Sequence, residues 1–561
     1  MPALQLTDTD RAMLDGERGA AAALAMRILV EMANIWEAKS FIHITSAHID
    51  SCLYHGKAGL DFAERLLEGG ARVVVPTTLN VSSLDLLHPQ LVRLDAETAA
   101  SARRLMDTYV AMGCRATWTC APYQLPDRPA FGEHVAWAES NAIVFANSVL
   151  GARTNRYGDF IDICAAITGR APLAGLHLDE HRRARIVFRL EGIPERLLRD
   201  EVTPTCVGHL VGKATGTAVP AIVGLPLDTG EDRLKALGAA AASSGAVAMF
   251  HAVGITPEAG TLEAALGGER VEREVTISTS DLRAARDELT TAGAGPIAAV
   301  SVGAPHLSAG ELHLITALVA DHPPVIPFYA NTGRDVAATT DIDELTRSSV
   351  TVVTDTCTYI TPIIHDVEGP VMTNSAKWAC TRRATSGSTS CSGRSRSACG
   401  RPRSVASGAT RSSGATMAKG RTLVAGQAKG IALVLDEPLS FWGGVDPATG
   451  AVIDVHHPQL GESVVGRILV VPSGRGSSSS SYVLAEAIRT GTAPAAIVLR
   501  EPDGIIALGA IVARELYGII VPVVTVGEAS YDELRSEMVV QVDASDDTGS
   551  VTRLADDARG G

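Results

Sequence analysis

Apolar residues recur at helical spacing over residues 8–36, where the chain reads DTDRAMLDGERGAAAALAMRILVEMANIW. Polar residues between Thr7 and Asp10 can cap the start of such a helix. After it, short apolar runs typical of strands alternate with amphipathic stretches, as in SFIHITSAH, AGLDFAERLLEGG and ARVVVPTTLN. Strand, helix and strand at this spacing predict α/β units with parallel strands.

Small polar residues end many of the apolar runs. They occur in ITSAH, PTTLN, SVGAPH and VTDTC. Ligands in α/β folds bind at the carboxyl ends of parallel strands. The pattern therefore predicts a polar site assembled from these ends.

The pattern changes near residue 417. From Lys419 onward a β-rich start with Gly and Pro turns leads into a Gly/Ser stretch and then a helix. The sequence DDTGSVTRLADDARGG at the end is typical of a disordered tail. We therefore expect four segments: a large catalytic part over 1–380, an aberrant segment over 381–418, a compact β-rich domain over 419–545 and a disordered tail over 546–561.

Composition and charge narrow the class of protein. The chain has 561 residues, of which 46% are hydrophobic, and a net charge of −14. An acidic chain is a poor partner for nucleic acid or an anionic membrane. No signal peptide or run long enough to span a membrane is evident. We expect a cytoplasmic enzyme acting on a small molecule, with its oligomeric state open.

One stretch, CTRRATSGSTSCSGRSRSACGRPRSVASGATRSSGAT from Cys380 to Thr416, resembles nothing else in the chain. It has seven arginines and no acidic residue. Such a segment cannot bury enough apolar surface to order itself, so we expect it to be disordered.

Three motifs carry candidate chemistry. In SGRGSSSSSYVLAEAIRTG, a strand, a Gly-rich turn, serines and a helix can form an anion site, although a flexible serine linker has the same composition. Cys120 and Cys357 each lie in a polar loop beside a predicted strand end; a lone cysteine is usually a small buried hydrophobe. AWAESNAIVFANSVLGARTNR gathers amides and hydroxyls suited to a polar substrate, or to a solvated helix end.

Several long motifs occur in an order that resembles the aconitase X family. They are LDGERGAAAALAMRILVEMANIWEAKSFIHITSAHI, GLDFAERLLEGGARVVVPTTLN, TCAPY, AESNAIVFANSVLGARTNR, FHAVGITPEA and MTNSAKWA. The C-terminal GRGSSSSSYVLAEAIRTGTAPAAIVL resembles the small swivelling domain of that family, fused here behind the large part. The resemblance implies a multidomain aconitase-like core of α/β units with a β-rich swivelling C-terminal domain.

The resemblance also implies a dehydratase (a hydro-lyase) that uses an iron–sulfur cluster held by three cysteines. An iron left open in such a cluster acts as a Lewis acid on the leaving hydroxyl. Carried over residue by residue, Ser477 is the catalytic base, and Cys120 and Cys357 are cluster ligands. The remaining candidates are substrate-binding side chains: Ser46, His48, Thr78, Asn80, Asn141, Ser148, Arg153, Thr154, Asn155, Lys377, Ser478 and Ser479. We expect both thiols to share one cavity, lined also by His48, Thr78, Asn80, Asn141, Ser148 and Thr154.

The third ligand falls where the resemblance stops, directly after NSAKWAC. A one-base shift of a possible coding sequence for Thr381–Gly400 regroups into an apolar strand that ends in Glu-Cys, as in the family. We therefore interpret 381–416 as a frameshifted segment, with a basic inserted linker as the alternative. Cys380, Cys391 and Cys399 are no safe substitutes for the lost ligand, so an inactive product is an alternative to an active enzyme.

The family resemblance divides into two substrate types. The mevalonate 5-phosphate dehydratases are identified by the pattern HxSGxSY. The corresponding stretch here, HIDSCLYHGKAG, departs from that pattern at Asp50, Ser51, Cys52 and Leu53. A fused single chain resembles the hydroxyproline dehydratases. The resemblance thus implies conversion of cis-3-hydroxy-L-proline to 1-pyrroline-2-carboxylate, with mevalonate 5-phosphate dehydration as the alternative.

Overall fold

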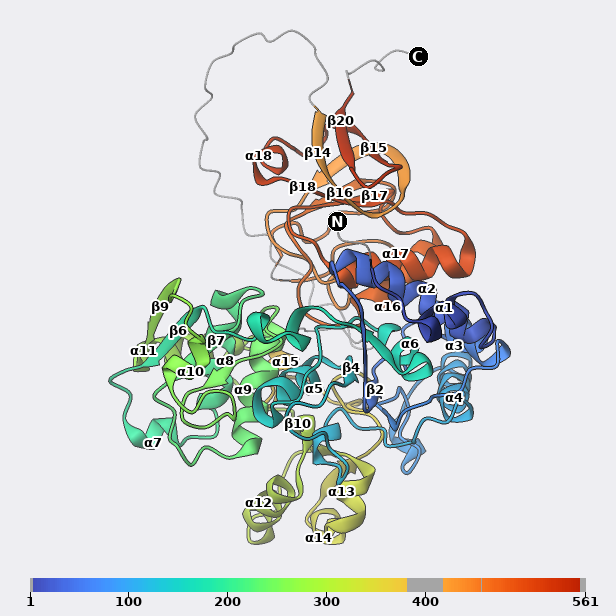
Figure 1. Cartoon of the computed structure of the whole chain (residues 1–561). Helices are drawn as coiled ribbons and strands as arrows, with labels where there is room; N and C mark the ends of the chain where they lie inside the picture. The colour runs from blue at the N-terminus through green and yellow to red at the C-terminus, as the bar shows by residue number, and fades with distance from the viewer. Residues whose placement is uncertain (1–3, 381–416, 456, 555–561) are drawn as a thin grey trace.

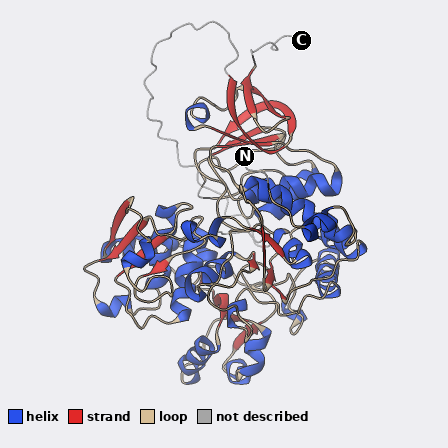
Figure 2. Cartoon of the chain, viewed as in Figure 1, coloured by secondary structure: helices blue, strands red, loops and turns tan. Residues whose placement is uncertain are grey.

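A computed structural model describes residues 4–380, 417–455 and 457–554. These residues form four open sheets and one closed barrel (Figures 1 and 2). The expectations for residues 381–416 and 555–561 lie outside the described residues. Among the helices of the described ranges, none is both long and apolar enough to cross a membrane.

The N-terminal region contains a parallel sheet of strand order β3-β2-β4 and a short antiparallel pair, β1-β5. Its strands are β1 (Phe41–His43), β2 (Ala47–Ile49), β3 (Thr77–Leu79), β4 (Ala136–Trp137) and β5 (Arg170–Pro172). Its helices are α1 (Asp8–Leu14), α2 (Ala20–Ile35), α3 (Lys57–Glu68), α4 (Ala96–Ala111), α5 (Ser140–Phe145), which continues as a π-helix (Ala146–Leu150), and α6 (Ile161–Thr168).

The single helix expected over 8–36 is two helices, α1 and α2. The connection between them contains Gly16 and Gly19, whose φ angles are 85° and 98°. This left-handed backbone does not continue a helix, and glycine adopts it without steric cost. The apolar periodicity on both sides of the turn hid the break.

Two further parallel sheets follow. The first has the order β8-β7-β6-β9 and the second the order β12-β11-β10-β13. Their strands are β6 (Ile186–Leu190), β7 (Pro220–Val223), β8 (His251–Ala252), β9 (Arg273–Ile277), β10 (Ala299–Leu307), β11 (Phe328–Thr332), β12 (Val350–Val353) and β13 (Val371–Met372). Their helices are α7 (Glu195–Leu198), α8 (Thr203–Thr215), α9 (Glu231–Ser244), α10 (Leu262–Leu266), α11 (Thr279–Leu289), α12 (Ala309–Ala320), α13 (Arg334–Thr339), α14 (Ile342–Arg347) and α15 (Ala376–Cys380).

The C-terminal region is a barrel of strand order β14-β18-β17-β16-β15-β19-β20. The strands are β14 (Met417–Val424), β15 (Gly426–Val434), β16 (Ile468–Val471), β17 (Ala496–Leu499), β18 (Val523–Val526), β19 (Val539–Ala544) and β20 (Ser550–Arg553), with helices α16 (Ser480–Thr490), α17 (Gly504–Tyr517) and α18 (Glu528–Tyr531). The expected disordered tail is wrong over 550–553: β20 pairs with β14 and β19, so its backbone groups are used in closing the barrel.

The barrel region and the N-terminal region share one hydrophobic core. Buried residues of α2 and α3 belong to the same cluster as those of α16 and α17, and Figure 1 shows these helices stacked between the barrel and the sheets. Ala58 N–H donates to Glu486 (2.8 Å), and Tyr517 donates to Asp61 (2.8 Å). In this conformation the barrel is therefore docked onto the large part, which places the serine-rich loop against the sheets.

Candidate active site

A cavity lies where the N-terminal region, the β10–β13 region and the barrel region meet. With its mouth it holds about 470 Å³ of space free of protein atoms. Its walls come from nine separate stretches of the chain: Asp50, Leu53, Asn80, Val81, Cys120, Glu139, Asn141, Ala304, Pro305, Cys357, Tyr359, Ile360, Lys377, Trp442, Ser477 and Ser479.

Cys120 and Cys357 both line this cavity, although they are far apart in sequence. Cys357 lies in the turn that follows β12, and Cys120 accepts a hydrogen bond from the backbone N–H of His306 (3.3 Å). Burial raises the pKa of the Cys120 thiol, and the neighbouring charges of Glu139 and Cys357 raise it further. The two thiols therefore lie on the walls of one cavity, as the sequence predicted.

The surroundings of Cys357 partly favour its thiolate. Burial raises its pKa to about 11, while the backbone N–H groups of Tyr359 and Ile360 and the charge of Lys377 act in the opposite direction. N–H donors aimed at a sulfur stabilise its negative charge, which is the form that binds metals. A cation bound in this cavity would lower the pKa of both thiols.

A charged and amide-bearing wall lies beside the thiols. Glu139, whose side chain is buried, caps α5 by accepting from Ala142 N–H (2.8 Å) and forms an ion pair with Lys377 (2.5 Å). Asn141 donates to the carbonyl of Cys120 (3.0 Å) and accepts from the hydroxyl of Tyr123 (2.6 Å). This network fixes the wall that carries Cys120.

The serine loop, residues 472–479, connects β16 to α16 and supplies Ser477 and Ser479 to the cavity. The Ser479 N–H donates to the Ser477 hydroxyl oxygen (3.2 Å). Ser478 points to the other side, where its hydroxyl donates to Asp50 (2.5 Å). The strand–turn–helix form expected from the sequence is observed here, and the loop faces the large part.

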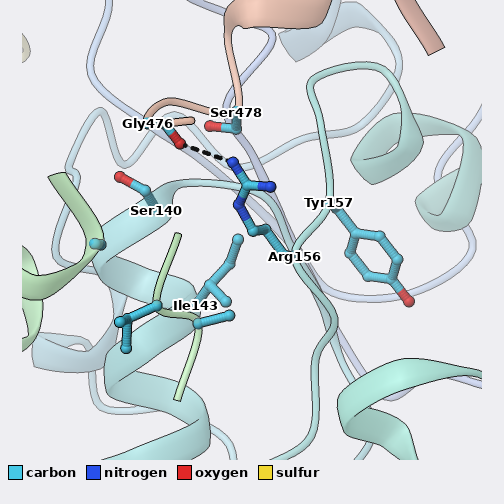
Figure 3. Close-up of a pocket in the computed structure, with 9 residues that line it drawn as sticks. Ser140, Ile143, Arg156, Tyr157, Gly476 and Ser478 are labelled. Carbon is cyan, nitrogen blue, oxygen red and sulfur yellow. Dashed lines mark hydrogen bonds between the residues drawn. The ribbon is translucent and has the colours of Figure 1, made fainter. Parts of the chain in front are cut away.

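A second, smaller pocket lies on the far side of the serine loop (Figure 3). Arg156 extends across it, and its guanidinium donates to the carbonyl of Gly476 (3.3 Å) and lies 3.5 Å from Asp503. In this view Ser478 lies above the guanidinium and Ser140 lies to its left. Arg156 thus ties the serine loop to the segment that follows α5.

The structure brings together seven of the residues expected at the site. The cavity is lined by Asn80, Cys120, Asn141, Cys357, Lys377, Ser477 and Ser479. Ser478 lines the second pocket instead. Asn80, Ser477 and Ser479 come from two strand ends, β3 and β16, as the rule for parallel sheets predicts.

Seven other expected residues do not line the cavity: Ser46, His48, Thr78, Ser148, Arg153, Thr154 and Asn155. The prediction that these residues line the cavity is therefore wrong. Their side chains or backbone groups instead form hydrogen bonds and contacts within the fold.

The hydroxyls and the histidine in this group serve the sheet and the helix ends. His48 and Thr78 hydrogen-bond to each other across β2 and β3 (2.8 Å). Thr154 accepts from Trp137 N–H (3.1 Å), and Ser148 accepts from Phe250 N–H (2.9 Å). Thr154 and Ser148 thus satisfy buried backbone N–H donors, while Thr78 is the partner of the His48 ring.

The remaining three residues, Ser46, Arg153 and Asn155, also have their contacts outside the cavity. Arg153 pairs with Asp179 and donates to the carbonyl of His177 (3.1 Å). Asn155 lies against Gly175, where an added Cβ would be 2.3 Å from its amide oxygen. The carbonyl of Ser46 accepts from Ala136 N–H (3.0 Å), which joins its segment to the one that enters β4.

Sequence reasoning missed two carboxylates of the cavity, Asp50 and Glu139. Both were visible in quoted motifs: Asp50 breaks the phosphate-type pattern, and Glu139 lies in the amide-rich stretch. Tyr359 and Trp442 were also missed. No sequence pattern around the two aromatic residues indicates a site. Trp442 reaches the cavity only because the barrel region docks onto the large part.

The cavity supplies part of what an iron–sulfur cluster needs. Two thiols share its walls, but among the described residues no group of three or more His, Cys, Asp or Glu side chains is arranged to hold a metal ion. The donors present fit one side of a cluster, and among the described residues no third thiol lines the cavity.

Comparison with known proteins gives the family. Models of the aconitase X first, second, third and swivel domains match residues 3–180, 184–287, 297–399 and 417–552. A cis-3-hydroxy-L-proline dehydratase of Pseudomonas aeruginosa is 45% identical over 66% of this chain and 65% of its own length. The alignment thus spans just under two thirds of that relative.

Two archaeal relatives are matched over most of their length. The phosphomevalonate dehydratase large subunit of Methanothermobacter thermautotrophicus is 36% identical over 64% of this chain and 88% of its own length. The crystal structure of Thermococcus kodakaraensis aconitase X (holo-form) superposes with a TM-score of 0.61 at 34% identity, covering 67% of this chain and 94% of that one. This chain therefore belongs to the aconitase X family.

Proposed function

We propose that this protein is a hydro-lyase that removes water from cis-3-hydroxy-L-proline and yields 1-pyrroline-2-carboxylate. The observation that carries the proposal is the single cavity that joins Cys120, Cys357 and the serine loop. The 45% identity to a relative named for this reaction supports the substrate.

The charges of the cavity favour a zwitterionic amino acid over a phosphorylated substrate. Its charged side chains are Asp50, Glu139 and Lys377, so two carboxylates face one ammonium group. A phosphate group would require several unpaired cationic or N–H donors. The ring ammonium of hydroxyproline, in contrast, is attracted by the carboxylates. The alternative, dehydration of mevalonate 5-phosphate, is supported by the 36% identical archaeal relative.

The proposed reaction divides between the walls of the cavity. Ser477 takes part in removing the C2 proton, while Asn80, Asn141 and Lys377 orient the carboxylate and stabilise its enolate-like charge. An iron–sulfur cluster held by Cys120 and Cys357 would supply a Lewis acid for the hydroxyl that leaves C3. The enamine that remains then tautomerises to 1-pyrroline-2-carboxylate.

The test is to incubate the purified full chain, under reducing and iron-replete conditions, with each substrate and to follow the product by chromatography and mass spectrometry. We expect turnover of cis-3-hydroxy-L-proline and none of mevalonate 5-phosphate. The reverse preference would overturn the proposal in favour of the alternative.

The aberrant composition of 381–416 leaves an inactive product as the competing interpretation. Iron and sulfide analysis of the purified protein distinguishes an enzyme from such a product. Cys120→Ser should lower the bound iron and the turnover together, whereas Cys206→Ser, in the core of the β6–β9 region, should change neither. A full chain without iron, sulfide and turnover would support the inactive product.

A further inference from the structure

Three carboxylates are buried together beside the serine loop. The side chains of Asp50, Asp159 and Asp162 are 4%, 0% and 0% exposed. Carboxylates this close cannot all be ionised in a buried environment, so at least one must hold a proton at neutral pH. Each has a different set of partners, and these sets indicate different roles.

Asp162 is a structural anchor. Its carboxylate accepts from the backbone N–H groups of Asp50 (2.7 Å), Ser51 (3.3 Å) and Ile163 (2.7 Å). These bonds hold the turn after β2 against the start of α6. Asp162 therefore fixes the backbone position of Asp50, and it does not line the cavity.

Asp50 is the carboxylate that reaches the cavity. One of its oxygens accepts from the Asn80 amide and the other from the Ser478 hydroxyl (2.5 Å). Both contacts present donors to it, which is the arrangement of a carboxylate that accepts protons. It lines the same cavity as Ser477 and Ser479, in which the proposed substrate would bind.

Asp159 does not line the cavity, and its backbone N–H donates to the carbonyl of Ser478 in the serine loop (3.3 Å). Neither of its oxygens has a hydrogen-bond partner of ordinary geometry within the described ranges. Burial raises its pKa well above the usual range, and the charges of Asp50 and Asp162 raise it further, while Ser479 acts in the opposite direction. A buried carboxyl without hydrogen-bond partners favours its neutral form, so we assign a proton to Asp159.

We propose that Asp50 is a catalytic residue that finally accepts the proton leaving C2 of the substrate, and that Asp159 is the positioning residue that keeps a neutral carboxyl behind it. This inference rests on the proposed dehydration. It also solves a chemical problem of that proposal: a serine hydroxyl is a weak base unless an adjacent group accepts its proton.

The step balances without a further reactant. The C2–H bond breaks, its electron pair becomes the C2–C3 double bond, and the C3–O electron pair leaves with the hydroxyl. The C2 proton passes to the hydroxyl oxygen of Ser477 while the proton of that hydroxyl passes to Asp50, which lines the same cavity. Asp50 then protonates the departing hydroxide, so water is released and the carboxylate is restored.

The surrounding groups define the pH dependence. Asp159 and Asp162 face Asp50 from the segment around α6, Cys52 lies on its own turn, and Tyr109 and Tyr482 lie behind the cluster from α4 and α16. Across the cavity are Glu139 and Lys377. Among these, Asp159 is the group whose ionisation would place a second negative charge directly behind Asp50.

The test uses the full chain and three variants: Asp50→Asn, Asp159→Asn and, as a control, Asp107→Asn on the exposed face of α4. Asp50→Asn should lower kcat at least a thousandfold at an iron content and melting temperature close to those of the parent. Asp159→Asn mimics the neutral carboxyl. In a plot of kcat against pH it should keep the fall at acidic pH and lose the fall at alkaline pH that ionisation of Asp159 produces.

A second readout isolates proton removal from loss of water. L-proline has no hydroxyl to lose, so exchange of its C2 hydrogen in D2O, followed by NMR, reports the base alone. The parent and Asp107→Asn should catalyse this exchange, and Asp50→Asn should not. Exchange or turnover by Asp50→Asn at the parental rate would overturn the role of Asp50. A parent that neither exchanges L-proline nor dehydrates hydroxyproline would instead refute the proposed function.

Discussion

Tyr482 of α16 lies directly over Gly59 of α3, across the boundary between the barrel region and the large part. A Cβ added at Gly59 would lie 1.9 Å from the ring of Tyr482. The ring is fully buried, and its hydroxyl donates to the carbonyl of Gly56 (2.8 Å). The absence of a side chain at Gly59 thus permits the docking of the two regions.

Substituting Gly59 by alanine should therefore loosen this docking. Alanine favours a helix by up to about 1 kcal/mol, but overpacking against a rigid buried ring costs about 1–3 kcal/mol, so we expect net destabilisation. Turnover should fall with it, because the serine loop is held by the same interface. Thermal unfolding and kcat measurements on Gly59→Ala check this prediction. The control is Gly260→Ala, where an added Cβ would meet no atom within 4 Å. Equal melting temperatures for the two variants would contradict the prediction.

The tie between Arg156 and the serine loop gives a second prediction. Arg156→Ala removes the bond to Gly476 and leaves Asp503 without its guanidinium. A hydrogen bond to a charged group contributes about 1.5–3 kcal/mol, so kcat/KM should fall at least about tenfold. Arg27→Ala breaks a more exposed ion pair, with Glu515, across the same boundary and should retain most of its activity. Similar losses in both variants would assign the effect to docking in general.

The ion pair between Lys377 and Glu139 is a third case. The Glu139 side chain is 2% exposed, so Lys377→Met leaves a buried charge without its main partner. Such a loss costs about 3–5 kcal/mol. The double variant Lys377→Met/Glu139→Gln should recover part of the free energy of unfolding. As a control, Lys213→Met breaks an exposed pair with Glu288 and should cost at most about 1 kcal/mol. Urea unfolding followed by circular dichroism measures all three.

The buried His48 predicts acid sensitivity. Burial lowers its pKa to about 3, while the unfolded chain binds a proton near pH 6.5. Between these values the unfolded state binds more protons, so stability is complete above pH 6.5 and is lost as the pH falls. From pH 6.5 to 4.5 this amounts to about 2–3 kcal/mol. His48→Asn, which keeps a polar partner for Thr78, should flatten the dependence measured by urea unfolding at the two pH values. His313→Asn, at an exposed position, should not.

The sequence by itself determined the order of elements and the local form of the serine loop. Periodicity marked α3 correctly, and the strand–turn–helix around Ser477 followed from glycine, serine and a helical apolar pattern. The strands were marked less well: SFIHITSAH holds β1 and only the start of β2, and in ARVVVPTTLN the strand is Thr77–Leu79 and not the apolar run before it. These features depend on neighbours within a few residues, which a sequence displays directly. The same reasoning missed the turn at Gly16, because a break of a few residues does not interrupt apolar spacing.

Only the tertiary structure decided which polar residues share the cavity. Thr78 and Asn80 are two positions apart, yet Asn80 lines the cavity and Thr78 bonds to His48. Likewise, Asn141 lies beside Cys120 while Ser148, on the same segment, satisfies a distant backbone N–H. Partners remote in sequence settle such choices, because every buried polar group must find a donor or acceptor wherever the fold provides one. Asp50 acquired its place on the cavity wall in the same way, through Asp162, Asn80 and a serine that the barrel region brings to it.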